Sequence, residues 1–178
     1  YKKFKEENPK SDIIRLGIGN TTEPLTMHIG RGIRKGVARL RSRKTYTGYG
    51  DEQGERELRE SLSRFYHETR KVSIEPEEIF INDGAKPDLG NIQSLFGLDN
   101  VIAVQDPVYP AYVDTSVFSG RGGAFNQQTK KYERIVYLPC TPENNFFPKL
   151  PSEKVDIIYF CSPNNPTGAV ATRQQLEQ

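Results

Sequence analysis

Residues 155–168, VDIIYFCSPNNPTG, decide the fold. The first seven are mostly branched and aromatic with no regular polar alternation, which predicts a buried β-strand over 155–161. The next seven hold two prolines, two asparagines and a glycine, a composition typical of a tight loop. A helix is expected next, because Thr172 can cap a segment in which Gln175 comes three residues later and Leu176 begins an apolar face. This stretch therefore predicts a strand, a loop and a helix.

The same alternation extends upstream. Apolar runs that end at glycine, proline or polar clusters predict strands, and apolar residues at helical spacing predict helices. The expected strands are 12–19, 77–83, 100–107 and 134–138, and the expected helices are 26–44, 55–71, 86–96 and 111–119. This order predicts an α/β fold with a mostly parallel sheet and helices on both faces, in three layers. In such sheets ligands bind at the carboxyl ends of the strands.

Charge and composition exclude several classes of protein. The 178 residues hold 25 Lys and Arg against 23 Asp and Glu, a net charge of +2. That balance disfavours a dedicated nucleic-acid binder. No run approaches the roughly 18 apolar residues that cross a bilayer, and the charged N-terminal stretch lacks the apolar core of a signal peptide. We therefore expect no membrane insertion.

The cysteines and histidines are too few and too scattered for a metal site. Cys140 and Cys161 lack CxxC spacing, and only His28 and His67 accompany them. The sequence therefore predicts neither a disulfide framework nor a bound metal.

Helix 26–44 is amphipathic. Its apolar residues recur at helical spacing, while the arginines and lysines fall mostly elsewhere around it; the apolar set is Ile29, Ile33, Val37 and Leu40. A solvated basic face is the favoured interpretation, and contact with phosphate or nucleic acid is the alternative.

The glycine-rich stretches do not complete a nucleotide-binding motif. The pairs that begin at Gly17, Gly30 and Gly48 each lack the third glycine of G-x-G-x-x-G. The stretch DGAK, residues 83–86, lacks the frame of a P-loop. Dinucleotide-dependent dehydrogenases and P-loop NTPases are therefore disfavoured.

Three strand-end loops carry candidate binding residues. After strand 77–83 the chain turns at Gly84 into a helix, so backbone N–H groups around Ala85 and Lys86 can bind a phosphate, although most such turns bind nothing. Tyr109, between two prolines, can present its ring to a flat aromatic ligand or pack in the core. An asparagine amide in NNPTG can donate to a ligand phenolate.

The motifs resemble a known family. NNPTG after an apolar strand, with DPVYP and DGAK upstream in that order, resembles the large domain of fold-type I, pyridoxal-phosphate-dependent aminotransferases. LGIGNTTEP, GYGDEQG and ENNFFP bring the resemblance closer to the LL-diaminopimelate aminotransferases of plants, algae and chlamydiae. It implies a truncated large domain: residues 1–44 would be an N-terminal segment with substrate loop and interface helix, and 45–178 the first part of the cofactor-binding domain.

The resemblance also implies roles for individual residues. The backbone at Ala85 and Lys86 would hold the phosphate of pyridoxal 5'-phosphate, Tyr109 would stack on its ring, and Asn165 would bind its phenolic oxygen. Lys86, Tyr109 and Asn165 would also contact the amino-acid substrate. Tyr49 would reach the cofactor in the neighbouring subunit of a homodimer.

Two further residues would recognise the substrate. Gly19 would lie against its α-carboxylate, and Glu52 would bind its distal ammonium group, because an unpaired buried charge costs several kcal/mol. Asn20 stands where the family usually has Asp, which removes a negative charge from this loop. No catalytic residue is expected here, since the Schiff-base lysine of the family would follow residue 178, so we expect this piece alone to be inactive.

The implied reaction moves an amino group between LL-2,6-diaminopimelate and 2-oxoglutarate, giving tetrahydrodipicolinate and glutamate on the route to lysine. The alternatives are a related aminotransferase acting on lysine or another amino acid in plant defence, a lyase of the aminocyclopropane-carboxylate synthase kind, and a non-catalytic binding module. The expected compartment is the plastid in a plant or alga and the cytoplasm in a bacterium.

Overall fold

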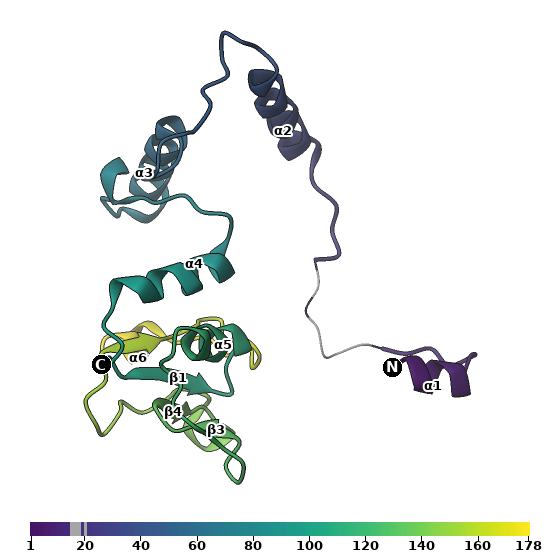
Figure 1. The fold of residues 1–178 in the computed structure, drawn as a ribbon, viewed down its shortest axis with the longest axis vertical. Coiled ribbons are helices and arrows are strands. Elements are labelled where there is room, and N and C mark those ends of the chain that lie inside the picture. Colours follow the sequence, from purple (N-terminus) through teal and green to yellow (C-terminus); the bar gives the residue numbers. More distant parts are fainter. Residues whose placement is uncertain (15–18, 20) are drawn as a thin grey trace. The chain divides into compact units, whose positions relative to one another are not determined.

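The computed structural model describes residues 1–14, 19 and 21–178 (Figure 1). They form two compact units, Tyr1–Gly50 and Asp51–Gln178, and each is described by itself.

The first unit holds two helices, α1 (Lys2–Glu7) and α2 (Met27–Leu40). The hydroxyl of Thr26 caps α2 by accepting a hydrogen bond from the backbone N–H of Ile29, at 3.4 Å. The helix predicted over 26–44 is therefore confirmed, although it ends at Leu40. The predicted strand 12–19 falls largely on residues 15–18, which lie outside the described residues, as does Asn20.

A parallel sheet forms the core of the second unit. Its strands are β1 (Ile102–Asp106), β4 (Ile135–Pro139) and β5 (Ile157–Tyr159), in the order β4-β1-β5. Ile102 of β1 is level with Ile135 on one side and Ile157 on the other. Because β1 is paired on both edges and covered, its first four residues are all buried, which accounts for the continuous apolar run.

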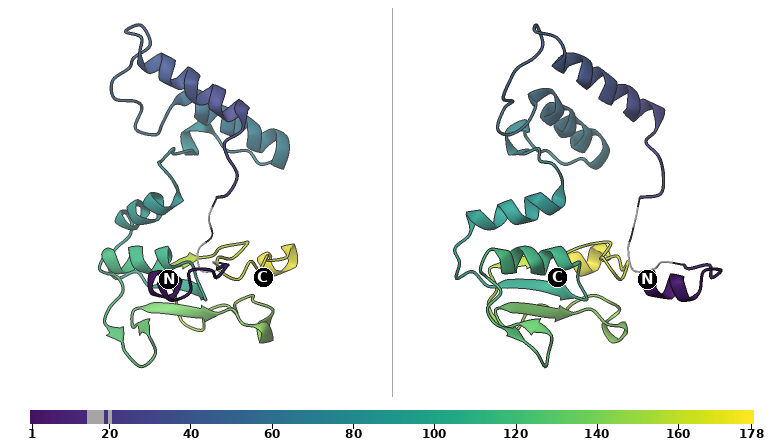
Figure 2. Two further views of the ribbon diagram at one scale, coloured as in Figure 1. Left: turned by 90° about the vertical axis from the view of Figure 1, so that its right-hand side faces the viewer. Right: turned by 45° about the vertical axis from the view of Figure 1, so that its right-hand side comes forward.

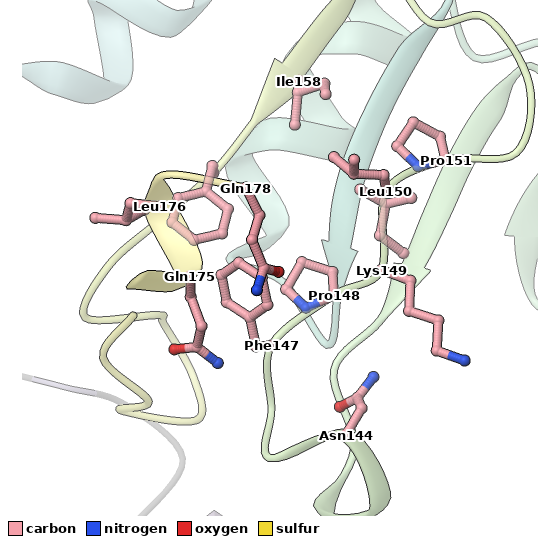
Figure 3. A pocket seen from close by; sticks show the side chains of 12 residues that line it. Asn144, Phe147, Pro148, Lys149, Leu150, Pro151, Ile158, Gln175, Leu176 and Gln178 are labelled. Carbon is pink, nitrogen blue, oxygen red and sulfur yellow. The ribbon is translucent and has the colours of Figure 1, made fainter. Parts of the chain in front are cut away.

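Helices lie on both faces of this sheet, as predicted. On one face, Tyr112 and Val113 of α5 (Pro110–Phe118) pack against Ile102 and Val104. The alternating residues of the strands point to the opposite face, where Leu176 of α6 (Arg173–Leu176) helps to line an apolar pocket of about 590 Å³ (Figure 3). Leu138 of β4, Ile158 of β5 and Phe160, which follows β5, also line that pocket.

Upstream of the sheet the unit is helical, with α3 (Arg56–Arg70), α4 (Ala85–Asn91) and the 3₁₀ turns η1 (Pro76–Glu78) and η2 (Ile92–Leu95). Helices 55–71 and 86–96 are thereby confirmed, the second with a 3₁₀ end.

The strand predicted over 77–83 is wrong. Pro76 begins η1, and Glu75 and Glu78 close a capping box around that turn. The backbone N–H of Ile81 then donates to the carbonyl of Gln53 at 2.9 Å, but no strand ladder develops there. The turn that Pro76 and the capping box stabilise therefore forms in place of the strand that the apolar residues predict.

A short hairpin was not predicted. β2 (Phe125–Asn126) pairs with β3 (Lys131–Tyr132), and the rings of Phe125 and Tyr132 lie 5.0 Å apart. The side-chain oxygen of Asn126 accepts hydrogen bonds from the backbone N–H groups of Gln128 and Thr129, which stabilises the turn. After β4, a further 3₁₀ turn, η3 (Pro142–Asn144), follows.

Within the described parts of the chain, no helix has the length and apolar character needed to span a bilayer.

Candidate active site

Two loops meet at the carboxyl edge of the sheet. β1 is followed by Pro107 and Tyr109, and β5 by the loop that contains Asn164 and Asn165. Since β1 and β5 are parallel neighbours, both loops leave the sheet at the same edge. A hydrogen bond from Asn164 Nδ2 to the carbonyl of Pro107, at 3.2 Å, joins them. Tyr109 and Asn165 are therefore brought to one edge, as the sequence predicts.

A buried amide reinforces this junction. The side-chain oxygen of Gln105, a buried residue of β1, accepts a hydrogen bond from the backbone N–H of Cys161 at 2.7 Å. The sequence analysis missed this residue, and its only signal is a polar side chain inside the apolar run of β1. Because Gln105 precedes the loop of Tyr109 and Cys161 precedes that of Asn165, the bond fixes the two strand ends against each other.

The two adjacent asparagines do different work. Asn164 is 3% exposed, and its Nδ2 also contacts the hydroxyl of Thr167 at 3.1 Å. Asn165 is exposed, and none of the hydrogen bonds among the described residues uses its side chain. Asn165 is thus available to a ligand, while Asn164 builds the loop. The sequence analysis did not separate the two roles, which only their burial distinguishes.

Tyr109 is braced by a second tyrosine. It is half-buried directly before α5, and its ring meets that of Tyr112 edge-on, with centroids 6.1 Å apart. Tyr112 stacks in turn on Tyr159 of β5 at 5.1 Å. Burial raises the pKa of the Tyr112 hydroxyl, and the nearby Cys161 sulfur adds to the rise. Tyr112 takes the core position, so the ring of Tyr109 stays partly open.

The first turn of α4 offers unused backbone donors. Gly84 precedes it at a φ of 130°, and its own N–H donates to the side chain of Asn82. A positive φ of this size favours glycine. The backbone N–H groups of Ala85 and Lys86 make no hydrogen bond within the described part of the chain. They are the free donors that the sequence predicts at this turn.

The end of α4 is held against α5. α4 packs on α5, and Gln93 in η2 donates to the hydroxyls of Ser116 and Tyr159. Buried Arg121, which follows α5, donates to the carbonyls of Gln93, Phe96 and Gly97. The segment that follows α4 is thus held against the end of α5, and α4 begins on the side where β1 ends (Figures 1 and 2).

The other residues that the sequence predicts for the site lie in exposed positions. Glu52 is exposed in the loop that precedes α3, and Lys86 is exposed on the first turn of α4. Gly19 and Tyr49 belong to the first unit and are not placed against the second. Both are exposed, Tyr49 completely.

An ion pair lies beside the strand end. Lys131 Nζ is 2.6 Å from a carboxylate oxygen of Asp106, the last residue of β1, and 4.8 Å from the ring centroid of Tyr137. No group of three or more His, Cys, Asp and Glu side chains suited to a metal ion occurs among the residues described. The chemistry of the edge is therefore that of amide donors, backbone N–H groups, an aromatic ring and a paired lysine.

Known proteins share this sequence and fold. An LL-diaminopimelate aminotransferase of Protochlamydia amoebophila is 49% identical over 176 residues, and one of Methanosphaera stadtmanae is 48% identical over 175. Each alignment covers 98% of this chain and 42% of the relative. The solved L,L-diaminopimelate aminotransferase of Chlamydomonas reinhardtii is 48% identical, with a TM-score of 0.85 over 98% of this chain and 42% of that one.

The TM-score of 0.85 to that solved structure confirms the predicted fold-type I architecture. Residues 11–178 match the family described as aminotransferase class I and II. The chain belongs to the class I and II aminotransferases.

Proposed function

We propose that a polypeptide of the relatives' length containing these residues is a pyridoxal-phosphate-dependent aminotransferase. It would exchange an amino group between LL-2,6-diaminopimelate and 2-oxoglutarate, giving tetrahydrodipicolinate and glutamate. The observation that carries the proposal is the sheet edge shared by the loops of Tyr109 and Asn165, which the hydrogen bond from Asn164 to Pro107 joins. Identities of 48–49% to diaminopimelate aminotransferases support the substrate. Because the chain spans 42% of their length, it supplies part of such a site.

The donor set fits the cofactor. A phosphate needs several N–H donors, a pyridine ring needs a flat apolar surface, and a phenolate needs one donor. The free backbone N–H groups of Ala85 and Lys86, the open ring of Tyr109 and the amide of Asn165 match these needs in that order. These four residues, with Tyr49 of a second subunit, would hold the cofactor.

In the proposed mechanism, the residues of this chain would bind and orient the cofactor and the substrate. When bound, pyridoxal phosphate supplies an electron sink for the bond broken at the substrate α-carbon. Tyr109 would lie against the flat face of the cofactor ring, and its own ring is braced by the edge-on contact with Tyr112. Asn165 would donate a hydrogen bond to the phenolic oxygen and so favour its ionised form, since a hydrogen bond to the charged form of an acid lowers the pKa of that acid.

Substrate recognition would rest on charge. The exposed ammonium of Lys86 would pair with a substrate carboxylate, and Gly19 leaves room for the α-carboxylate because it has no side chain. Glu52 would pair with the distal ammonium, a group that diaminopimelate has and glutamate lacks. Lys86, Tyr109 and Asn165 would contact substrate and cofactor alike.

The proposed assembly is a homodimer with shared active sites. The complete exposure of Tyr49 supports a role in a neighbouring subunit. The apolar face of α2 supports an interface helix, because its four apolar side chains are each about half exposed or more. Residues 1–44 would then form the segment with the substrate loop and interface helix, and 45–178 the first part of the cofactor domain. The compartment would be the plastid in a plant or alga and the cytoplasm in a bacterium.

The test is spectroscopic and kinetic. The full-length protein should develop the near-visible absorbance of bound pyridoxal phosphate on titration, and then convert LL-diaminopimelate faster than lysine at equal concentration. A preference for lysine would favour the related defence-type aminotransferase. An absence of cofactor absorbance would refute the proposal and indicate a binding module.

A further inference from the structure

Arg59 is a buried charge on an otherwise exposed helix. Among the residues of α3 it alone is classed as buried, at 4% exposure. A guanidinium removed from water needs partners for its N–H groups. Its Nε donates to the carbonyl of Gly54 at 3.0 Å, Nη1 to that of Pro76 at 3.0 Å, and Nη2 to the Asp51 carboxylate at 2.9 Å.

These partners come from two separate segments. Asp51 and Gly54 bound the loop 51–54, which contains Glu52, whereas Pro76 begins the stretch that runs to Gly84. One guanidinium therefore ties the loop of Glu52 to the segment that leads into the phosphate-binding turn.

The loop makes further contacts with the same stretch. Ile81 N donates to the carbonyl of Gln53 at 2.9 Å, and Gln53 Nε2 donates to that of Glu77 at 2.9 Å. Gly54 sits so close that a Cβ there would come within 2.5 Å of the Ile81 Cβ, and its φ of 95° also favours glycine. Loop 51–54 therefore packs closely against residues 77–81, and Arg59 holds both ends of the loop through Asp51 and Gly54.

We infer that Arg59 is a positioning residue: its guanidinium clamps loop 51–54 against residues 76–81 and so fixes the backbone that carries Glu52. The inference rests on the proposed function, which gives Glu52 the distal ammonium of the substrate. A clamp of this kind matters because a small misplacement of a charge that binds substrate lowers the rate steeply.

The fork of an arginine is essential to the arrangement. Three donors point to three acceptors that lie around one planar group, and a lysine ammonium cannot match that geometry. Arg59→Lys keeps the positive charge beside Asp51 and should lose the fixed loop. Asp51→Asn removes the charge from one of the three acceptors and leaves the two backbone carbonyls in place, so the loop should stay largely held.

The experiment uses the full-length protein with Arg59→Gln, Arg59→Lys and Asp51→Asn. Arg56→Gln is the matched control, since Arg56 lies on the same helix in an exposed pair with Glu60. Hydrogen exchange at the amides of Gly54 and Ile81 reports the clamp without any activity. Single-turnover reactions with LL-diaminopimelate and with glutamate, each followed by cofactor absorbance, report its effect on the substrate.

We expect both Arg59 variants to lose protection at these two amides, while Arg56→Gln keeps it. The apparent affinity for diaminopimelate should fall by about tenfold or more, and that for glutamate, which has no distal ammonium, by less than about twofold. Equal losses with both substrates, or full protection in Arg59→Gln, would overturn the inference. A wild-type protein inert toward diaminopimelate would instead refute the proposed function, a result that the exchange data do not affect.

Discussion

The side-chain amide of Asn164 reaches from the loop after β5 to the carbonyl of Pro107 after β1, at 3.2 Å. This contact crosses 57 positions of sequence and holds together the two loops that carry Asn165 and Tyr109. The neighbouring Asn165 is exposed. Asn164 therefore holds the two loops together, while Asn165 is left open for the cofactor contact that we propose.

Substitution of the two asparagines should separate these functions. Asn164→Ala should lower the free energy of unfolding by about 1–3 kcal/mol, because the carbonyl of Pro107 and the hydroxyl of Thr167 each lose a buried partner. Asn165→Ala should leave stability within about 0.5 kcal/mol, as is usual for exposed positions. Urea unfolding of the cofactor-free protein gives both values.

Cofactor titration completes the comparison. Asn165→Ala should weaken pyridoxal phosphate binding by roughly 10- to 100-fold, which is what a hydrogen bond to a charged group contributes. If Asn164→Ala proved neutral in stability while Asn165→Ala unfolded the protein, the two assignments would be reversed.

Tyr109 should act through its ring. Tyr109→Phe keeps the edge-on contact with Tyr112 and should bind pyridoxal phosphate within a few-fold of the parent. Tyr109→Ala removes the stacking surface and should weaken binding by about tenfold. Absorbance titration of both variants measures the difference. Equal affinities for Phe and Ala would show that the ring does not contact the cofactor.

Sequence reasoning succeeded where periodicity and burial agree. The run 100–107 became the buried strand β1, because a strand that is paired on both edges and covered needs continuous apolar residues. The run 155–161 became only the three-residue strand β5, whose residues are half-buried or exposed and not buried as predicted. It failed at 77–83, where a proline and a capping box formed η1 instead. It also missed the two-residue strands β2 and β3, which are too short to show an alternation.

The candidate site was predictable only as loops. The sequence motifs predicted Tyr109 and Asn165 as site residues, because each lies next to a proline in a loop that follows a predicted strand. The supporting contacts from Asn164, Gln105 and Arg59 join segments far apart in sequence, and no local pattern shows them. Buried polar side chains that satisfy distant carbonyls emerge only from the folded chain.

Glu52 should determine substrate choice. Glu52→Gln keeps the size of the side chain but removes the charge, so the affinity for LL-diaminopimelate should fall by about tenfold, as expected when a charged pair is lost. Glutamate should react as before. Steady-state kinetics of the full-length protein with each amino donor measures this, with Glu57→Gln on α3 as the control. A parallel loss with glutamate would place Glu52 outside the distal ammonium site.

The two thiols should differ in reactivity. Cys140 is 1% exposed, and burial raises the pKa of its thiol. Cys161 is half-buried and donates through Sγ to the carbonyl of Pro163 at 3.1 Å. Because only the thiolate reacts, iodoacetamide at pH 8 should modify Cys161 first and Cys140 at least about tenfold more slowly.

The pH dependence follows from the direction of the shift at Cys140. A raised pKa means that the folded protein keeps the proton when the unfolded thiol has already lost it. Stability from this group is therefore complete below the ordinary thiol pKa and declines as pH rises through the raised value.

Labelling of Cys140 should accelerate as pH rises through that raised pKa, while Cys140→Ala should flatten the alkaline loss of stability. Peptide mass spectrometry at pH values from about 7 to about 10.5 measures the labelling of Cys140, and unfolding curves at the same pH values measure the stability. Rapid labelling of Cys140 at pH 7 would contradict its burial.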